Sequence, residues 1–179
     1  MSRNTQNTQK LAILSVLVAL QIVLARFCSF NAWNARIGIG FLPVALSGIL
    51  FGPLYAALVA GLSDFLGALL FPVGAYFPGF TLTAALMGAG FGIFLYRRLS
   101  LLRILAAVAL NQLVFSLLLN TLWISILYGA DFRGLLSSRF LQLLVIAPIQ
   151  FLLLSVLSSV WERIGLRQAL RGIASDEII

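Results

Sequence analysis

A single carboxylate lies deep in the apolar part of this sequence. Asp64 stands in the stretch LSDFLG, inside an apolar run from residue 54 to residue 71. If that run is a helix across a bilayer, Asp64 lies seven residues from its outer end, at a depth of about 10 Å. A charge there costs on the order of a few kcal/mol and usually faces a cavity or a partner. Two roles fit it: contact with a ligand or coupling ion, or a structural pair with an arginine or a helix end.

Arginine side chains gather at the same expected level. Arg26 and Arg36 flank the stretch FCSFNAWNARIGIG, and Arg133 and Arg139 follow a later apolar run with only Asp131 to offset them. A guanidinium group binds carboxylates through paired N–H groups. We therefore predict that Arg26 and Arg36 attract or hold an anionic ligand. Long basic side chains also extend to the membrane surface as anchors, and this is the role we expect for Arg133 and Arg139.

Aromatic residues crowd a short connection that reads GAYFPGFTLTA. Pro78 and the flanking glycines restrict this connection and let backbone approach a ligand closely. Aromatic residues at this level often form an anchoring belt, but a rigid aromatic pocket also suits a flat heterocycle. The aromatic and amide side chains expected near this level are Tyr76, Phe77, Phe80, Trp33, Trp123, Asn120 and Gln142.

The remaining composition excludes several kinds of site. The chain has one cysteine, Cys28, and no histidine, so it can form no disulfide within the chain and no zinc or haem site of His and Cys. The sequence has no GxxxxGK phosphate loop, so we expect no ATP hydrolysis by this chain alone. No Ser-His pair and no pair of carboxylates at one depth occurs. We predict that the protein is not an enzyme and needs no cofactor or metal.

Hydropathy predicts an integral membrane protein. The sequence is 61% hydrophobic and only 9% charged, against about 25% charged in soluble domains. Since lipid offers the backbone no hydrogen-bond partners, the apolar runs should be helices. We predict an all-α fold with six membrane-spanning helices in one domain, residues 1–179, after a polar segment 1–10. The approximate spans are 11–26, 40–52, 54–71, 80–96, 102–128 and 139–164.

The basic residues predict the orientation of these spans. Six crossings place both termini on one side, and with that side cytoplasmic, eight basic residues lie inside and four outside. The net charge of +7 is then explained by loops that flank spans, and we expect no nucleic acid partner. The outer connections are 27–40, 72–79 and 129–138, and they are the ones rich in aromatic, Gly or Arg residues. We predict that the outer side is the binding mouth.

Small residues mark places where helices can approach closely. Helix one carries Ser15 and Ala19 four residues apart, with Ala12 one turn earlier. The stretch GAGFG at 88–92 lies inside a predicted helix, so we interpret it as a packing face and not as a nucleotide loop. Helix one is the one whose small residues we expect to face a partner.

Two longer stretches give a resemblance to a known family. NARIGIGFLPVALSGILFGP at 34–53 and LSDFLGALLFPVGAYFPGFTLTAALMG at 62–88 resemble the substrate-binding S components of energy-coupling factor (ECF) vitamin transporters, most closely the folate-specific members. The resemblance covers nearly the whole chain. It implies a six-helix fold in the bacterial cytoplasmic membrane with a vitamin site at its outer face.

The resemblance also implies partners and a mode of action. Such a subunit assembles with a transmembrane coupling protein and two ABC ATPases, and delivers its ligand by reorienting in the membrane. Ala12, Ser15 and Ala19 resemble the small-residue surface that meets the coupling protein.

Folate gives the unusual residues a common purpose. Its pterin carries N–H donors whose hydrogen bonds Asp64 can accept in pairs. Its rings can stack on the aromatic residues Tyr76, Phe77, Phe80 and Trp123. Its glutamate tail has two carboxylates that Arg26 and Arg36 can bind. Two alternatives stay open at this point. One is an ion-coupled transporter that works alone with Asp64 as its ion site, and the other is an S component for another vitamin such as thiamin.

Overall fold

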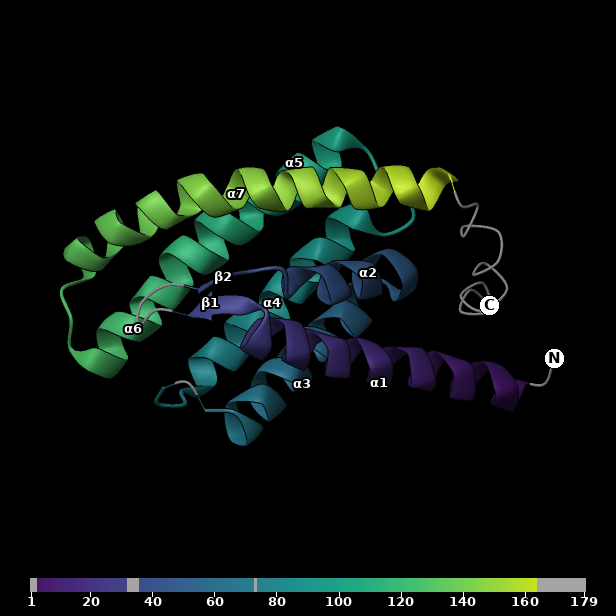
Figure 1. Cartoon of the computed structure of the whole chain (residues 1–179), viewed down its shortest axis with the longest axis horizontal. Helices are drawn as coiled ribbons and strands as arrows, with labels where there is room; N and C mark the ends of the chain where they lie inside the picture. Colours follow the sequence, from purple (N-terminus) through teal and green to yellow (C-terminus); the bar gives the residue numbers. More distant parts are fainter. Residues whose placement is uncertain (1–2, 32–35, 73, 164–179) are drawn as a thin grey trace.

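The computed structural model describes residues 3–31, 36–72 and 74–163, and this part of the chain is nearly all helical (Figure 1). Its elements in chain order are α1 (Arg3–Phe27), β1 (Ser29–Asn31), β2 (Arg36–Gly38), α2 (Phe41–Phe51), α3 (Pro53–Leu70), α4 (Pro78–Leu95), α5 (Leu101–Ala109), the π-helix η1 (Leu110–Leu119), α6 (Asn120–Tyr128) and α7 (Phe132–Arg163). The all-α membrane fold expected from the sequence is confirmed.

Five helical stretches are long and apolar enough to cross a membrane, and α2 is a shorter apolar helix. The stretches α5, η1 and α6 run on without a break and together form the span Leu101–Tyr128. The first helix begins at Arg3, because the polar residues before the apolar run continue the same helix. These elements correspond in order to the six predicted spans.

The last helix begins seven residues earlier than the sequence suggests. The predicted outer connection 129–138 is wrong, because α7 starts at Phe132 and not at Arg139. The backbone N–H of Gly134 donates to Asp131 Oδ2 over 2.8 Å, which satisfies one of the open N–H groups at the helix start. Only Gly129, with a φ of 62°, and the two residues after it separate α6 from α7.

Glycines bring α2, α3 and α4 together. A Cβ on Gly88 would overlap the backbone carbonyl of Ala56, and one on Gly92 would overlap the backbone of Pro53. The glycine-rich stretch 88–92 therefore serves close helix packing, as predicted. Gly52, with a φ of 89°, makes the turn from α2 into α3, and Pro53 occupies the first turn of α3, where its missing N–H costs nothing.

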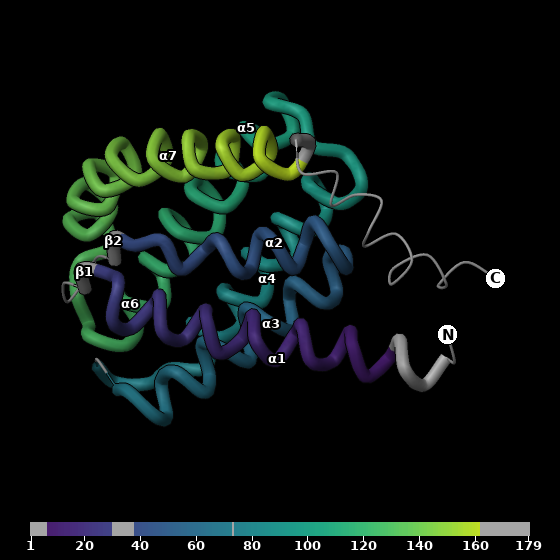
Figure 2. Tube along the Cα trace, turned by 45° about the vertical axis from the view of Figure 1, so that its right-hand side comes forward, coloured from purple at the N-terminus to yellow at the C-terminus, as the bar shows by residue number. Residues whose placement is uncertain are grey.

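The connections gather at one end of the bundle, which we call the loop end. It carries the antiparallel pair β1–β2, the segment 74–77 and the turn from α6 to α7 (Figure 1). The start of α1 and the end of α7 lie at the opposite end, where the second view also places them (Figure 2). This arrangement agrees with an even number of crossings. That the loop end faces outward stays a prediction.

The apolar core lies between α2, α3, α4, α5 and α7, on the side away from the loop end. Its most deeply buried members are Ala45, Val59, Phe91, Leu95, Ile104, Ala107, Val108 and Leu154. Large apolar side chains also cover the outside of the spans, as expected of surfaces that meet lipid. The core holds the helices together on this side of the bundle.

Candidate functional site

A cavity of about 590 Å³ lies among the helices. Helices α1, α3, α4 and α7, together with η1 and α6, contribute side chains to it. At the loop end it is lined by Ser29, Pro72, Gly74 and Tyr76, and at its inner end by Phe91, Gln112 and Gln150. A cavity of this size, with apolar walls and a few polar groups, has the character of a small-molecule site.

Asp64 lines this cavity and is held by a chain of hydroxyl groups. The Thr81 hydroxyl on α4 donates to Asp64 Oδ2 over 2.9 Å. The Tyr76 hydroxyl lies 3.2 Å from Thr81 Oγ1. Because the Thr81 hydroxyl already donates its proton to the carboxylate, the Tyr76 hydroxyl is the donor in the second bond. The chain links α3, α4 and the segment before α4, and it orients the carboxylate toward the cavity.

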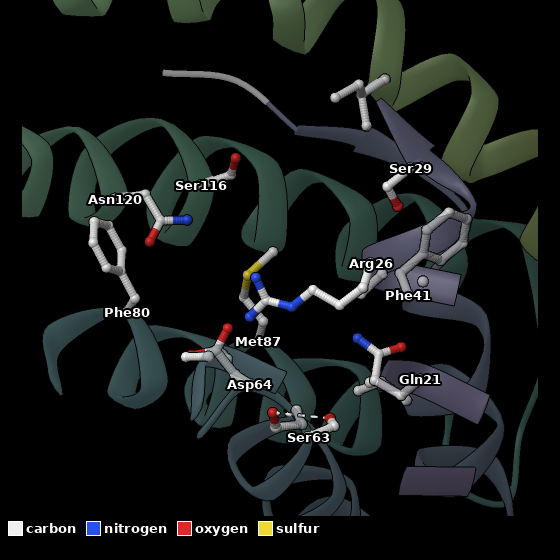
Figure 3. A pocket seen from close by; sticks show the side chains of 18 of the residues that line it. Gln21, Arg26, Ser29, Phe41, Ser63, Asp64, Phe80, Met87, Ser116 and Asn120 are labelled. Carbon is white, nitrogen blue, oxygen red and sulfur yellow. Dashed lines mark hydrogen bonds between the residues drawn. The ribbon is translucent and has the colours of Figure 1, made fainter. Parts of the chain in front are cut away.

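Arg26 reaches into the middle of the cavity from the end of α1 (Figure 3). Its side chain lies against α3, because a Cβ on Gly67 would come within 3.0 Å of Arg26 Nε. Figure 3 shows the guanidinium group extending toward Asp64 and Met87. Arg26 and Asp64 thus both line the cavity. The side chain of Arg36 lies outside the described part of the structure.

The predicted aromatic residues divide into two groups. Tyr76 and Phe80 line the cavity, whereas Phe77 and Trp123 do not. The Phe77 ring packs on Trp123, with centroids 5.5 Å apart, and on Phe80 at 6.1 Å. Trp123 Nε1 also donates to Thr83 Oγ1 over 2.9 Å. Phe77 and Trp123 therefore support the aromatic wall from behind.

The structure buries Arg139, which the sequence suggested to be a membrane-surface anchor. That expectation is wrong: the residue is only 7% exposed and lines the cavity. Its Nη2 group donates to the backbone carbonyl of Ser116 over 3.2 Å. Because α7 begins at Phe132, Arg139 lies two turns inside the helix and not at its end. Arg133, in the first turn of α7, is exposed as expected.

Amide side chains also line the cavity. Asn120 and Gln142 line the cavity, as expected, and Gln112 Nε2 donates to Gln150 Oε1 over 2.8 Å between η1 and α7. Polar lining residues thus recur on one face of α7 at positions 139, 142 and 150, and that spacing was readable in the sequence.

The π-helix sets which side chains of the fifth span face the cavity. The N–H of Asn120 bonds to the carbonyl of Phe115, five residues back. Gln112, Ser116 and Asn120 all line the cavity. Such helical segments are rare and often lie at functional sites. Sequence reasoning missed this register, and it also missed Gln21, Ser63, Thr81 and Met87, whose residue types are common in ordinary helix packing.

The small residues of α1 lie on a different surface. Ala12, Ser15 and Ala19 are exposed, and none of them lines the cavity. The Ser15 hydroxyl donates to the carbonyl of Leu11 over 2.9 Å and so remains within its own helix. Large apolar side chains beside them are also exposed, among them Val16 at 64%. This face of α1 can therefore contact lipid or another protein.

Comparisons with known proteins give a consistent result. The family model described as "ECF transporter, substrate-specific component" matches residues 9–158. The "Folate transporter FolT" of Clostridium novyi is 37% identical over 162 residues, which cover 90% of this chain and 92% of that protein. The protein of the same name from Leuconostoc mesenteroides is 28% identical over 151 residues, which cover 80% and 81%.

A solved structure gives the same match in three dimensions. It is titled "Crystal structure of FolT bound with folic acid" and superimposes with a TM-score of 0.80 at 33% identity. The match covers 84% of this chain and 92% of that one.

Proposed function

Because this chain belongs to the family of substrate-specific components of ECF transporters, we propose that it is a membrane-embedded folate-binding subunit of such an importer. The observation that carries the proposal is a cavity that combines Asp64, two arginines and aromatic side chains in a fold that matches a folate-bound structure. The subunit binds and delivers its ligand, whereas the energy comes from ATP hydrolysis by partner proteins.

In the proposed pose, each polar group of the cavity binds a different part of the ligand. Asp64, oriented by Thr81, accepts hydrogen bonds from the donors of the pterin edge. Phe80 and Tyr76 contact the aromatic rings, and Phe77 and Trp123 keep Phe80 in place. Arg26, with Arg36 at the mouth, attracts the carboxylates of the glutamate tail.

A binding titration tests the proposal. The purified chain in detergent is titrated with folic acid by calorimetry and tryptophan quenching, with thiamin and riboflavin as controls. We expect one-to-one binding of folic acid without ATP and no binding of the other two vitamins. Asp64→Asn should weaken folic acid binding. Binding of thiamin instead would identify a different ligand for the same fold, and uptake driven by an ion gradient alone would favour a transporter that works by itself.

The partners are the second part of the proposal. We propose that the exposed face of α1 with Ala12, Ser15 and Ala19 contacts a transmembrane coupling protein that carries two ABC ATPases. The small side chains permit close approach of a partner helix. Ala19→Leu should abolish co-purification with the coupling protein and leave folic acid binding unchanged. A matched control, Leu141→Phe, adds bulk on an exposed face of α7 and should retain the complex.

A further inference from the structure

We infer that the connection from α4 to α5, residues 96–103, binds the headgroup of an anionic phospholipid. The inference goes beyond the proposed function and does not depend on which ligand the cavity binds. Three observations support it: the position and charge of this connection, the backbone conformation of Arg97, and the exposed apolar side chains next to the arginines.

The connection lies at the end of the bundle opposite the loop end. Helix α4 begins at the loop end, has 18 residues and is about 27 Å long, which nearly spans the hydrocarbon core of a bilayer. The next span starts at Leu101 and returns to the loop end at Tyr128. The connection between them therefore lies at the level of the lipid headgroups.

Positive charge is concentrated in this connection. Its arginines are Arg97, Arg98 and Arg103, and the sequence has no acidic residue between Asp64 and Asp131. The structure places the Asp64 side chain in the cavity and the Asp131 side chain at the loop end. Arg97 and Arg98 are exposed, and Arg103 is partly exposed. The charge of the connection is thus complementary to anionic headgroups.

The backbone at Arg97 indicates that its side chain has a purpose. Arg97 has a φ of 62°, whereas the other positive-φ positions in the described part of the chain are Gly52 and Gly129. The N–H of Arg98 donates to the carbonyl of Tyr96 over 2.8 Å and closes a tight turn around Arg97. This conformation is unfavourable for arginine and costs glycine little. The guanidinium carbon lies 4.9 Å from the centroid of the Tyr96 ring, which holds the charge at the connection.

Exposed apolar side chains border the arginines. Leu101 and Leu102 lie between Arg98 and Arg103 in the sequence and are 62% and 76% exposed. Leu105, one turn further along α5, is also exposed. A phospholipid presents acyl chains directly below its headgroup, so a surface with both kinds of side chain suits a lipid better than a small inorganic anion.

Titration with lipids in an uncharged detergent tests the inference. The purified protein is titrated with phosphatidylglycerol, which is anionic, and with phosphatidylcholine, which has no net charge, and native mass spectrometry counts the bound lipids. We expect the wild type to prefer phosphatidylglycerol by about tenfold or more. The double variant Arg98→Gln with Arg103→Gln should reduce this preference to about twofold or less. Inorganic phosphate, added as a competitor, should not displace the lipid.

Arg97→Gly tests the third arginine, because glycine keeps the turn at positive φ and removes the charge. It should weaken phosphatidylglycerol binding about three- to tenfold without lowering the temperature of unfolding. Arg133→Gln is the matched control, because Arg133 is an exposed arginine at the loop end. This variant should keep the preference of the wild type.

Equal binding of the two lipids by the wild type would overturn the inference, and so would an unchanged preference in the double variant. Displacement of the lipid by inorganic phosphate would identify a general anion site and would also overturn it. If the double variant does not fold, an unchanged preference in both Arg98→Gln and Arg97→Gly overturns it instead. None of these arginines lines the cavity, so failure of the wild type to bind folic acid would overturn the proposed function and leave this inference standing.

Discussion

Removing one hydroxyl group tests whether the orientation of Asp64 matters for binding. Thr81→Val keeps the shape of the side chain and deletes the donor that lies 2.9 Å from Asp64 Oδ2. We expect the variant to fold normally and to bind folic acid more weakly, because the carboxylate is then free to turn away from the ligand. Thr81 does not line the cavity itself, so it acts as a positioning residue.

The magnitude follows from the kind of bond that is lost. A hydrogen bond to a charged group contributes about 1.5–3 kcal/mol. Asp64 is partly exposed, so water replaces part of this bond in the empty cavity. A ligand that fills the cavity displaces that water, and the loss therefore appears mainly in the complex. We expect binding to weaken by about 1–2 kcal/mol, which is about a 5- to 30-fold increase in Kd.

Calorimetric titration with folic acid measures the effect, and thermal unfolding of the empty protein tests the fold. Thr81→Ser keeps the hydroxyl group and should bind nearly as wild type does. Tyr76→Phe removes the hydroxyl group that lies 3.2 Å from Thr81 Oγ1, and it should raise the Kd for folic acid about twofold.

The double variant Thr81→Val with Asp64→Ala tests whether Thr81 acts through Asp64. Once the carboxylate is absent, Thr81→Val should cause no further loss of folic acid affinity. The reasoning would be refuted if Thr81→Val bound folic acid with wild-type affinity. It would also be refuted if Thr81→Val weakened binding by the same factor in the Asp64→Ala background.

Two further predictions concern stability and are measured by thermal unfolding in detergent. Gly88→Val should destabilise the protein by about 1–3 kcal/mol or prevent folding, because its Cβ would overlap the carbonyl of Ala56. Gly61→Ala, whose Cβ would make an ordinary 3.4 Å contact, should be nearly neutral, and equal effects at both sites would contradict the packing argument. Gln112→Leu should cost about 1–3 kcal/mol because it leaves the buried Gln150 amide without its partner. Changing both glutamines to leucine should recover much of that loss, and an additive loss would argue against the pair.

The helices were predictable because their cause is local. Apolar runs of about 20 residues in lipid must satisfy their own backbone groups, and the runs can be counted in the sequence. The ends of helices were less predictable. At the start of α7 the Gly134 N–H donates to the Asp131 side chain and the Leu135 N–H to the Asp131 backbone carbonyl, and the sequence pattern there resembles an ordinary polar loop. The pairing of Ser29 with Gly38 in the β1–β2 hairpin also had no clear signal, since its strands have only three residues each.

The members of the site were partly predictable from residue type. A lone carboxylate in a span is costly unless it serves a purpose, and an arginine beside an aromatic connection suits an anionic ligand. Both Asp64 and Arg26 line the cavity. Aromatic residues gave a weaker prediction, because packing and binding need the same side chains. Their periodicity did not reveal that Phe80 lines the cavity while Phe77 lies behind it against Trp123.

The sequence by itself determined the membrane environment, the order of the helices, the close packing at the glycines and the presence of charged groups that need a partner. These properties follow from composition and from spacing along one chain. Only the tertiary structure decided that Thr81 holds Asp64, and that Arg139 is buried beside Ser116. Contacts of this kind depend on the relative rotation of helices far apart in the sequence, and on the π-helical register of residues 110–119. No pattern within a single helix encodes that rotation, because it results from the packing of all the helices together.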